Sequence, residues 1–190
     1  MLRRTACAAA SNTSDQASRE FSRMSPARLR AATAADLDAV NGVIERAVMT
    51  WQLPERVKRL AMPSYRYGEQ DLAHLHLEVA DDGTDGIVGV AAWEAADPRD
   101  VPAGRRGLLL HGLYVDPARQ RGGVGTALLE AAIAAARAQH YDGLLVKAQA
   151  DADGFFAACG LQRLAVDNPE RDYAHRYWLH LTGREILNNV

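Results

Sequence analysis

One continuous segment of the chain, LLLHGLYVDPARQRGGVGTALLEAAIAAARAQH from Leu108 to His140, leaves few folds open. Its first part, LLLHGLYV, is almost continuously apolar, which is typical of a strand buried on both faces. A glycine-rich loop follows, and the alanine-rich remainder has high helix propensity and small side chains that can lie close on a sheet. A strand, a glycine loop and a helix in this order predict a mixed α/β domain.

Shorter periodic segments extend this central unit in both directions. Thr33 to Asp36 resembles a capping box, so a helix is expected to begin there and to run to about Trp51. The segment HLHLEVA, residues 74–80, alternates strictly, which predicts a half-buried strand in a hairpin with 87–94. Residues 62–70 are expected to form a loop. The remaining expected elements are strands 27–31, 108–115, 143–148, 161–166 and 173–181 and helices 55–60, 126–140 and 152–159.

Composition excludes several classes of partner. The chain of 190 residues is long enough for one domain, with 48% hydrophobic residues but no apolar run of membrane-spanning length, so no membrane partner is expected. The net charge of −2 and the pI near 6.3 argue against nucleic acid as the main partner. Cys7 and Cys159 lie far apart and indicate neither a disulfide framework nor a zinc site. A reducing, cytoplasmic location is the natural interpretation.

The two ends of the chain differ from the rest. Residues 1–23 are rich in Ala, Ser and Arg and lack the continuous apolar region of a secretory signal. An organellar transit peptide fits less well, because Asp15 and Glu20 are acidic. We therefore predict that 1–23 is a disordered extension or reflects a start codon upstream of Met24. The predicted domain covers 24–182, and 183–190 is expected to be a tail.

The glycine loop before the predicted helix has the features of an anion-binding site. The first N–H groups of a helix lack partners within the helix, and the helix dipole favours negative charge there. Gly122, Gly123 and Gly125 remove the Cβ atoms that would hold a phosphate away, and Arg119 and Arg121 could add contacts to it. A tight turn without a ligand would also explain the glycines.

Two well-known phosphate motifs do not fit this loop. A P-loop is excluded because Gly125 is followed by Thr126 rather than by lysine. The dinucleotide fingerprint fails as well, because Leu128 stands where its third glycine belongs.

Two blocks of sequence carry a resemblance to a known family. LYVDPARQRGGVGTALL resembles the central acetyl-CoA motif Q/R-x-x-G-x-G/A of the GNAT superfamily of N-acetyltransferases, with Gln120, Gly123 and Gly125 at the motif positions. QADADGFFAACGL resembles the second motif, N-x-x-A-x-x-F-Y-x-x-x-G-F. Its matching residues are Gln149, Ala152, Phe155, Phe156, Gly160 and Leu161. The resemblance implies a mixed, mostly antiparallel sheet flanked by helices, in which the parallel strands 108–115 and 143–148 splay apart at the acetyl-CoA site.

The same resemblance implies a reaction and a set of cosubstrate contacts. An acetyl group would move from acetyl-CoA to a primary amine of a small molecule by direct attack, without a metal ion. A protein N-terminus or lysine as acceptor stays open, as do a homodimer and a non-catalytic acyl-CoA-binding module. The residues expected to bind acetyl-CoA are Leu113, Tyr114, Val115, Gln120, Arg121, Gly122, Gly123, Val124, Gly125, Thr126, Gln149, Phe155 and Phe156.

Two residues are candidates for the general base, and the acid of the family is replaced. His111 is the first candidate for the general base, since some members carry a histidine there and histidine is the side chain most often used for proton transfer, although a hydrogen-bonded core histidine would explain it equally. Glu94 is the second candidate. The family places its acid, a tyrosine, where this chain has Phe156, so water, Cys159 or another tyrosine would have to replace it.

Other polar and aromatic residues are given weaker roles. His74, His76 and Glu78 share one face of the predicted strand, and we interpret them as a solvated face rather than a metal site. By analogy of position, the acceptor pocket is expected to draw on Trp51, Arg66, Tyr67, His175, Arg176 and Tyr177.

Overall fold

The computed structural model describes residues 27–168, 170 and 172–181. The predicted extension 1–23 and tail 183–190 lie outside the described residues. Within them, the elements follow the expected order: a short strand, helices, a hairpin, the central strand, loop and helix unit, and a final group of two strands and a short helix.

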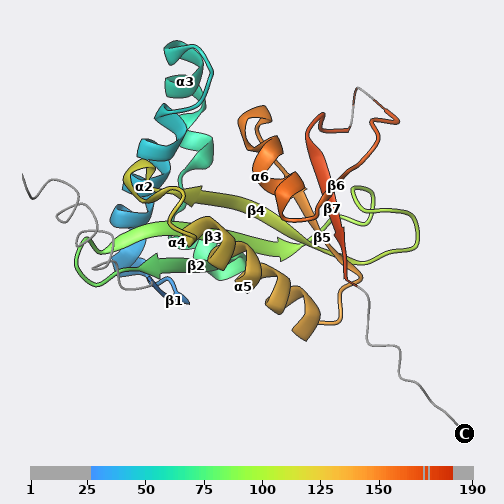
Figure 1. The fold of residues 1–190 in the computed structure, drawn as a ribbon, viewed down its shortest axis with the longest axis horizontal. Helices are drawn as coiled ribbons and strands as arrows, with labels where there is room; N and C mark the ends of the chain where they lie inside the picture. The colour runs from blue at the N-terminus through green and yellow to red at the C-terminus, as the bar shows by residue number, and fades with distance from the viewer. Residues whose placement is uncertain (1–26, 169, 171, 182–190) are drawn as a thin grey trace, which may run out of the picture.

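A single mixed sheet forms the centre of the molecule (Figure 1). Its seven strands lie in the order β1-β2-β3-β4-β5-β7-β6. Every neighbouring pair is antiparallel except β4 and β5, which are parallel. The predicted mixed, mostly antiparallel sheet is therefore confirmed. The strands are β1 (Arg28–Ala31), β2 (His76–Asp81), β3 (Ile87–Ala95), β4 (Gly107–Val115), β5 (Gly143–Lys147), β6 (Gln162–Arg163) and β7 (Arg176–His180).

Two long helices cover opposite faces of this sheet. Val90 and Ala92 of β3 pack with α2 (Leu37–Met49), whereas the alternate residues Ala91 and Trp93 pack in the core that includes α5 (Val124–Ala138). Alternation of this kind follows from the two-residue period of a strand. The shorter helices are η1 (Ala34–Asp36), α3 (Glu55–Tyr65), α4 (Glu69–His74), η2 (Pro117–Arg119), η3 (Ala150–Ala152) and α6 (Asp153–Ala158).

The predicted capping box at the first helix is present. The Thr33 backbone N–H donates to the Asp36 carboxylate at 2.8 Å. Arg30 of β1 donates to both oxygens of the same carboxylate at 2.9 Å, which ties the first strand to the start of the helical segment. The α2 helix then fully buries Val40 and Ile44, each of which contributes roughly 1.5–3 kcal/mol.

The structure differs from the sequence-based expectations in four segments. The expected loop 62–70 is partly helical, because α3 continues through Pro63 to Tyr65 and α4 begins at Glu69. Met62 and Tyr65 pack against the α2 core, so tertiary packing outweighs the local effect of proline. The expected strand 74–80 begins two residues later, because α4 takes up His74. The strands expected at 161–166 and 173–181 shrink to β6 and β7.

Two glycines leave space for a tryptophan ring where the parallel strands β4 and β5 begin. Gly107 and Gly143 stand opposite each other at the first position of β4 and β5. A Cβ atom at Gly107 would lie 2.8 Å from the ring of Trp178, and one at Gly143 would collide with the same ring. The indole therefore lies across the starts of both strands, and no larger residue fits at either position.

Candidate active site

The parallel strands β4 and β5 pair only over their first parts. Their register ends with Leu110 opposite Val146, whereas β4 continues to Val115. Beyond Leu110, the edge of β4 that faces β5 has no partner strand among the described residues. Backbone groups along such an edge need hydrogen-bond partners. An extended ligand can bind them in the manner of an added strand. We call this gap the β4–β5 opening.

A β-bulge lies at the point where the opening begins. Trp93 of β3 pairs with Leu110, and the preceding residue Ala92 pairs with Gly112, so His111 is an extra residue in β4. Bulges bend a strand and redirect side chains, and they are frequent beside active sites. The His111 side chain is exposed. The expectation that it lies inside a buried strand is therefore wrong, because the bulge takes it out of the regular alternation.

One buried tyrosine contacts this histidine. The Tyr67 hydroxyl lies 3.3 Å from His111 Nδ1. Tyr67 is only 6% exposed. Its backbone is fixed to α2 by two bonds of 2.9 Å: its N–H donates to Asn41 Oδ1, and Asn41 Nδ2 donates to its carbonyl. A Cβ atom at position 112 would lie 2.6 Å from the tyrosine hydroxyl, so Gly112 makes room for this contact.

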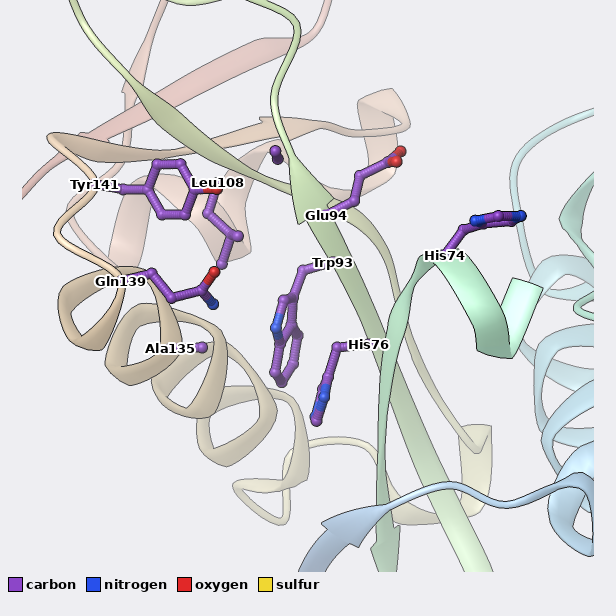
Figure 2. Close-up of a pocket in the computed structure, with 9 residues that line it drawn as sticks. His74, His76, Trp93, Glu94, Leu108, Ala135, Gln139 and Tyr141 are labelled. Carbon is purple, nitrogen blue, oxygen red and sulfur yellow. The ribbon is translucent and has the colours of Figure 1, made fainter. Parts of the chain in front are cut away.

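The electrostatic environment keeps the Tyr67 phenol protonated. Burial is the main cause that raises the pKa of Tyr67 far above its ordinary value, and the charges of Tyr114, Asp71 and Glu94 act in the same direction. Glu94 is half-buried near the end of β3. Figure 2 shows it on the opposite side of β3 from Trp93. The charge of this carboxylate acts on Tyr67, and Glu94 also lines the hollow at the end of β3.

An open hollow lies at the end of β3 on the α5 side (Figure 2). His76 stacks on Trp93 with ring centroids 4.5 Å apart, and its Nε2 lies 2.9 Å from a Glu78 oxygen. His74 belongs to α4 and points away from this pair in the figure. The three side chains therefore do not share one strand face. No group of three metal-ligating side chains occurs within residues 27–168, 170 and 172–181.

The glycine loop has an open, amide-lined shape. Gly123 is the N-cap of α5 with φ of 84°, and Arg121 also has a positive φ of 62°. No atom lies within 4 Å of where a Cβ of Gly123 would stand. Gly125 faces inward instead, because its Cβ would contact Val115 at 3.5 Å and Phe155 at 3.6 Å. Gly123 therefore borders open space at the start of a 15-residue helix, and the first-turn amides of such a helix suit an anion such as a pyrophosphate.

Arg119 does not take part in this anion site. Its guanidinium binds Asp82, and it contacts Asp85 at 2.7 Å, both in the turn between β2 and β3. Two carboxylates neutralise the cation and fix the loop to the hairpin. The expectation that Arg119 contacts phosphate is therefore wrong. Arg121 and Gln120 are exposed beside the first-turn amides.

The second sequence block lies on the other side of the opening. Gln149 follows β5 and comes before α6, which carries Phe155 and Phe156. Phe156 is 4% exposed and stacks on Tyr177 with ring centroids 5.9 Å apart. Phe155 is half-buried and packs on the edge of Phe156 at 5.1 Å. The ring at position 156 therefore contributes packing and offers no hydroxyl.

A row of aromatic side chains crosses from β4 to the segment after β5. Trp51 stacks on Tyr114 with ring centroids 6.3 Å apart and meets Tyr65 edge-on at 5.3 Å. The Tyr65 hydroxyl lies 3.5 Å from Gln149 Nε2. We call Trp51, Tyr65 and Tyr114 the aromatic bridge. The Gln52 backbone N–H also donates to the Asp151 carboxylate at 2.8 Å, and this bond connects the loop after α2 to η3.

The other residues expected around the acceptor are separated by the structure. Arg66 pairs with Glu45 at 2.7 Å on the surface. Arg176 is 6% exposed and donates to the Ala165 carbonyl at 3.0 Å, so it holds the segment between β6 and β7. Tyr177 is buried beneath α6, and His175 Nδ1 lies 3.0 Å from Asp153 Oδ1. Trp51 and Tyr67 alone of this set lie beside β4.

Sequence reasoning missed Tyr65 and Gly112. Tyr65 was expected in a loop, and nothing in the sequence signals that α3 would carry it to Gln149. For Gly112 a signal exists, because a glycine inside an apolar strand indicates a bulge or a close approach of another group.

A family model confirms what the two sequence blocks indicate. The model described as the acetyltransferase (GNAT) family matches residues 45–161, which is more than half of the chain. The chain therefore belongs to the GNAT family of acetyl-CoA-dependent acetyltransferases. No curated protein matches the sequence significantly. None of the described helices is long and apolar enough to cross a membrane.

Solved structures share the fold at low sequence identity. A GNAT-family acetyltransferase from Desulfovibrio desulfuricans is 21% identical with a TM-score of 0.59, covering 80% of this chain and 98% of its own. One from Brucella melitensis, solved with acetyl-CoA, is 18% identical with a TM-score of 0.56, covering 82% and 88%. The PaiA N-acetyltransferase from Thermoplasma acidophilum, solved with coenzyme A, is 12% identical with a TM-score of 0.64, covering 81% and 98%.

Proposed function

We propose that this protein transfers the acetyl group of acetyl-CoA to a primary amine of a small molecule, by direct attack within a ternary complex. The observation that carries this proposal is the placement of an exposed histidine, His111, on a bulge at the start of the β4–β5 opening. The acetyl-CoA and coenzyme A in the Brucella and Thermoplasma structures support the choice of donor.

In this proposal, backbone atoms bind most of the cosubstrate. The unpaired edge of β4 at Leu113, Tyr114 and Val115 holds the pantetheine arm like an added strand. The loop and first turn of α5 hold the pyrophosphate through the segment Gln120, Arg121, Gly122, Gly123, Val124, Gly125 and Thr126. Gln149, Phe155 and Phe156 border the arm from the side of β5 and α6. Open space above Gly123 supports this assignment.

His111 acts as the general base in this scheme. An amine is mostly protonated at neutral pH and must lose a proton to become a nucleophile. With Nδ1–H donating to the Tyr67 oxygen, the Nε2 lone pair of His111 is free to accept that proton. The imidazolium that results keeps the same bond to Tyr67, whose raised pKa keeps it a neutral acceptor. Glu94, whose charge acts on Tyr67, is the alternative base, directly or through water.

The test is a comparison of His111→Gln with Glu94→Gln in a thiol-release assay over a panel of amines. We expect His111→Gln to lower kcat about 10²-fold or more, because placed bases contribute about that much, while the Kd for acetyl-CoA stays unchanged. A wild-type rate in His111→Gln together with a slow Glu94→Gln would move the base to Glu94. Acetyl-CoA binding without turnover on any small amine would favour a protein acceptor or a non-catalytic module.

A further inference from the structure

The described site lacks a proton donor where the family's second motif would place one. When an amine displaces the thioester, the sulfur of CoA leaves as a thiolate and is helped by a nearby acid. Position 156 holds phenylalanine, and its ring is buried against Tyr177. A tyrosine that replaces this hydroxyl must therefore come from another element. All six tyrosines of the chain lie within the described residues, so their hydroxyls can be compared.

The positions or contacts of four of these tyrosines exclude them as proton donors to the sulfur of CoA. Tyr67 is engaged with His111. Tyr177 lies under Phe156 and donates to Asp153, a bond that is the main cause of the lowered pKa of that carboxyl. Tyr114 is 9% exposed and covered by Trp51. Tyr141 stands before β5, under Arg106 at 5.3 Å, at the end of the parallel pair away from the opening.

Tyr65 and Tyr173 remain, and their contacts separate them. Tyr173 is 40% exposed in the segment before β7. Tyr65 is half-buried at the end of α3, and its ring is held edge-on by Trp51 at 5.3 Å. Its hydroxyl lies 3.5 Å from Nε2 of Gln149, a residue of the second cosubstrate motif. Tyr65 therefore presents its hydroxyl at the β4–β5 opening from the side opposite α6.

We propose that Tyr65 is the acid that protonates the departing sulfur of CoA, in place of the hydroxyl missing at Phe156. The inference rests on the proposed function. Tyr65 also raises the pKa of Tyr114 on β4 and of Tyr173 before β7, after the larger effect of burial on each. These effects agree with a phenol that stands between the two sides of the opening.

The step balances without a further reactant. The amine nitrogen forms a bond to the thioester carbonyl carbon as the carbon–sulfur bond breaks. The Tyr65 hydroxyl gives its proton to the sulfur, so CoA leaves as the thiol. The proton that the amine has lost returns through solvent to the tyrosinate. The net change is amine plus acetyl-CoA to amide plus CoA.

The first measurement needs no acceptor. The thiol pKa of bound CoA is followed by thiolate absorbance, with desulfo-CoA as the blank, in wild type, Tyr65→Phe and Tyr173→Phe. A hydroxyl that bonds the thiolate lowers the pKa of the thiol, so Tyr65→Phe is expected to raise it by about one unit or more. Tyr173→Phe, which removes a neighbouring hydroxyl, is the matched control and should leave the value unchanged.

The second measurement is turnover. Tyr65→Phe should lower kcat at least about 10-fold with acetyl-CoA, and less with a thioester whose leaving thiol is more acidic. Adding Phe156→Tyr should restore part of the rate. An unchanged thiol pKa and an unchanged kcat in a folded Tyr65→Phe that binds CoA would overturn the role of Tyr65 alone. Failure of the wild type to bind CoA would overturn the proposed function and this inference with it.

Discussion

The β4–β5 opening is formed by backbone atoms on one side and by side chains on the side toward α2 and α3. The side expected to hold the cosubstrate consists mainly of backbone: the unpaired edge of β4 and the amides at the start of α5, where Gly123 has a positive φ. The side toward α2 and α3 consists of side chains from the end of α3 and from the segments that follow α2 and α3, with Tyr67 against His111 and Trp51 against Tyr65. A backbone site tolerates many sequences, whereas a side-chain site is particular to one chain. Family membership therefore identifies acetyl-CoA as the acetyl donor, but it does not identify the acceptor.

The strongest test of this contrast adds a side chain to the backbone side. Gly123→Glu places a carboxylate beside the expected pyrophosphate and should weaken acetyl-CoA binding by at least about 100-fold, through repulsion of like charges. Calorimetric titration measures this effect. Gly104→Glu is the matched control, since Gly104 has a similar φ of 74° and nothing within 4 Å of its Cβ position. Equal affinity in the two variants would remove the pyrophosphate from this loop.

A second test disturbs the side-chain side. In Gly112→Ala the added methyl would stand 2.6 Å from the Tyr67 hydroxyl and 2.7 Å from the Tyr114 ring. We expect a loss of about 1–3 kcal/mol in the free energy of unfolding, and a lower kcat because Tyr67 moves away from His111. Denaturant unfolding and single-turnover kinetics measure the two effects. We expect the Kd for acetyl-CoA to stay nearly unchanged while kcat falls. A Kd that rises by the same factor as kcat falls would show that cosubstrate binding depends on these side chains as well.

The smallest expected effect lies away from the opening, at the Arg30–Asp36 pair. Hydrogen bonds from Arg30 are the main cause that holds the pKa of Asp36 far below its ordinary value. A carboxyl with a lowered folded pKa stabilises the protein above its unfolded pKa and loses this contribution as pH falls. Asp36→Asn should therefore cost less than about 1 kcal/mol at pH 7, and this cost should shrink as pH falls below about 4 and vanish below the folded pKa. Thermal unfolding across pH checks this, and an undiminished difference at low pH would contradict it.

The contrast between local and tertiary features also explains which parts of the structure the sequence predicts. The central strand, loop and helix, the hairpin and the α2 core were predictable because their apolar periods and turn residues are local. The extension of α3 beyond Pro63 was not, because contacts of Met62 and Tyr65 with the α2 core decide it. The exposure of His111 depends on a one-residue mismatch between β3 and β4, which neither strand reveals alone. The binding of Arg119 to the hairpin likewise required the fold.

The bulge carries one more consequence, for the length of the chain. Leu110 packs toward α5, Gly112 adjoins Tyr67 on the α2 side, and Leu113 packs toward α5 again. Without His111, Leu110 and Gly112 would follow each other in regular alternation opposite Trp93 and Ala92. The pairing of β3 with β4 therefore does not need His111, and deletion of this residue is expected to leave these two strands in continuous register. What the extra residue adds is an exposed imidazole at the level where the pairing of β4 with β5 ends.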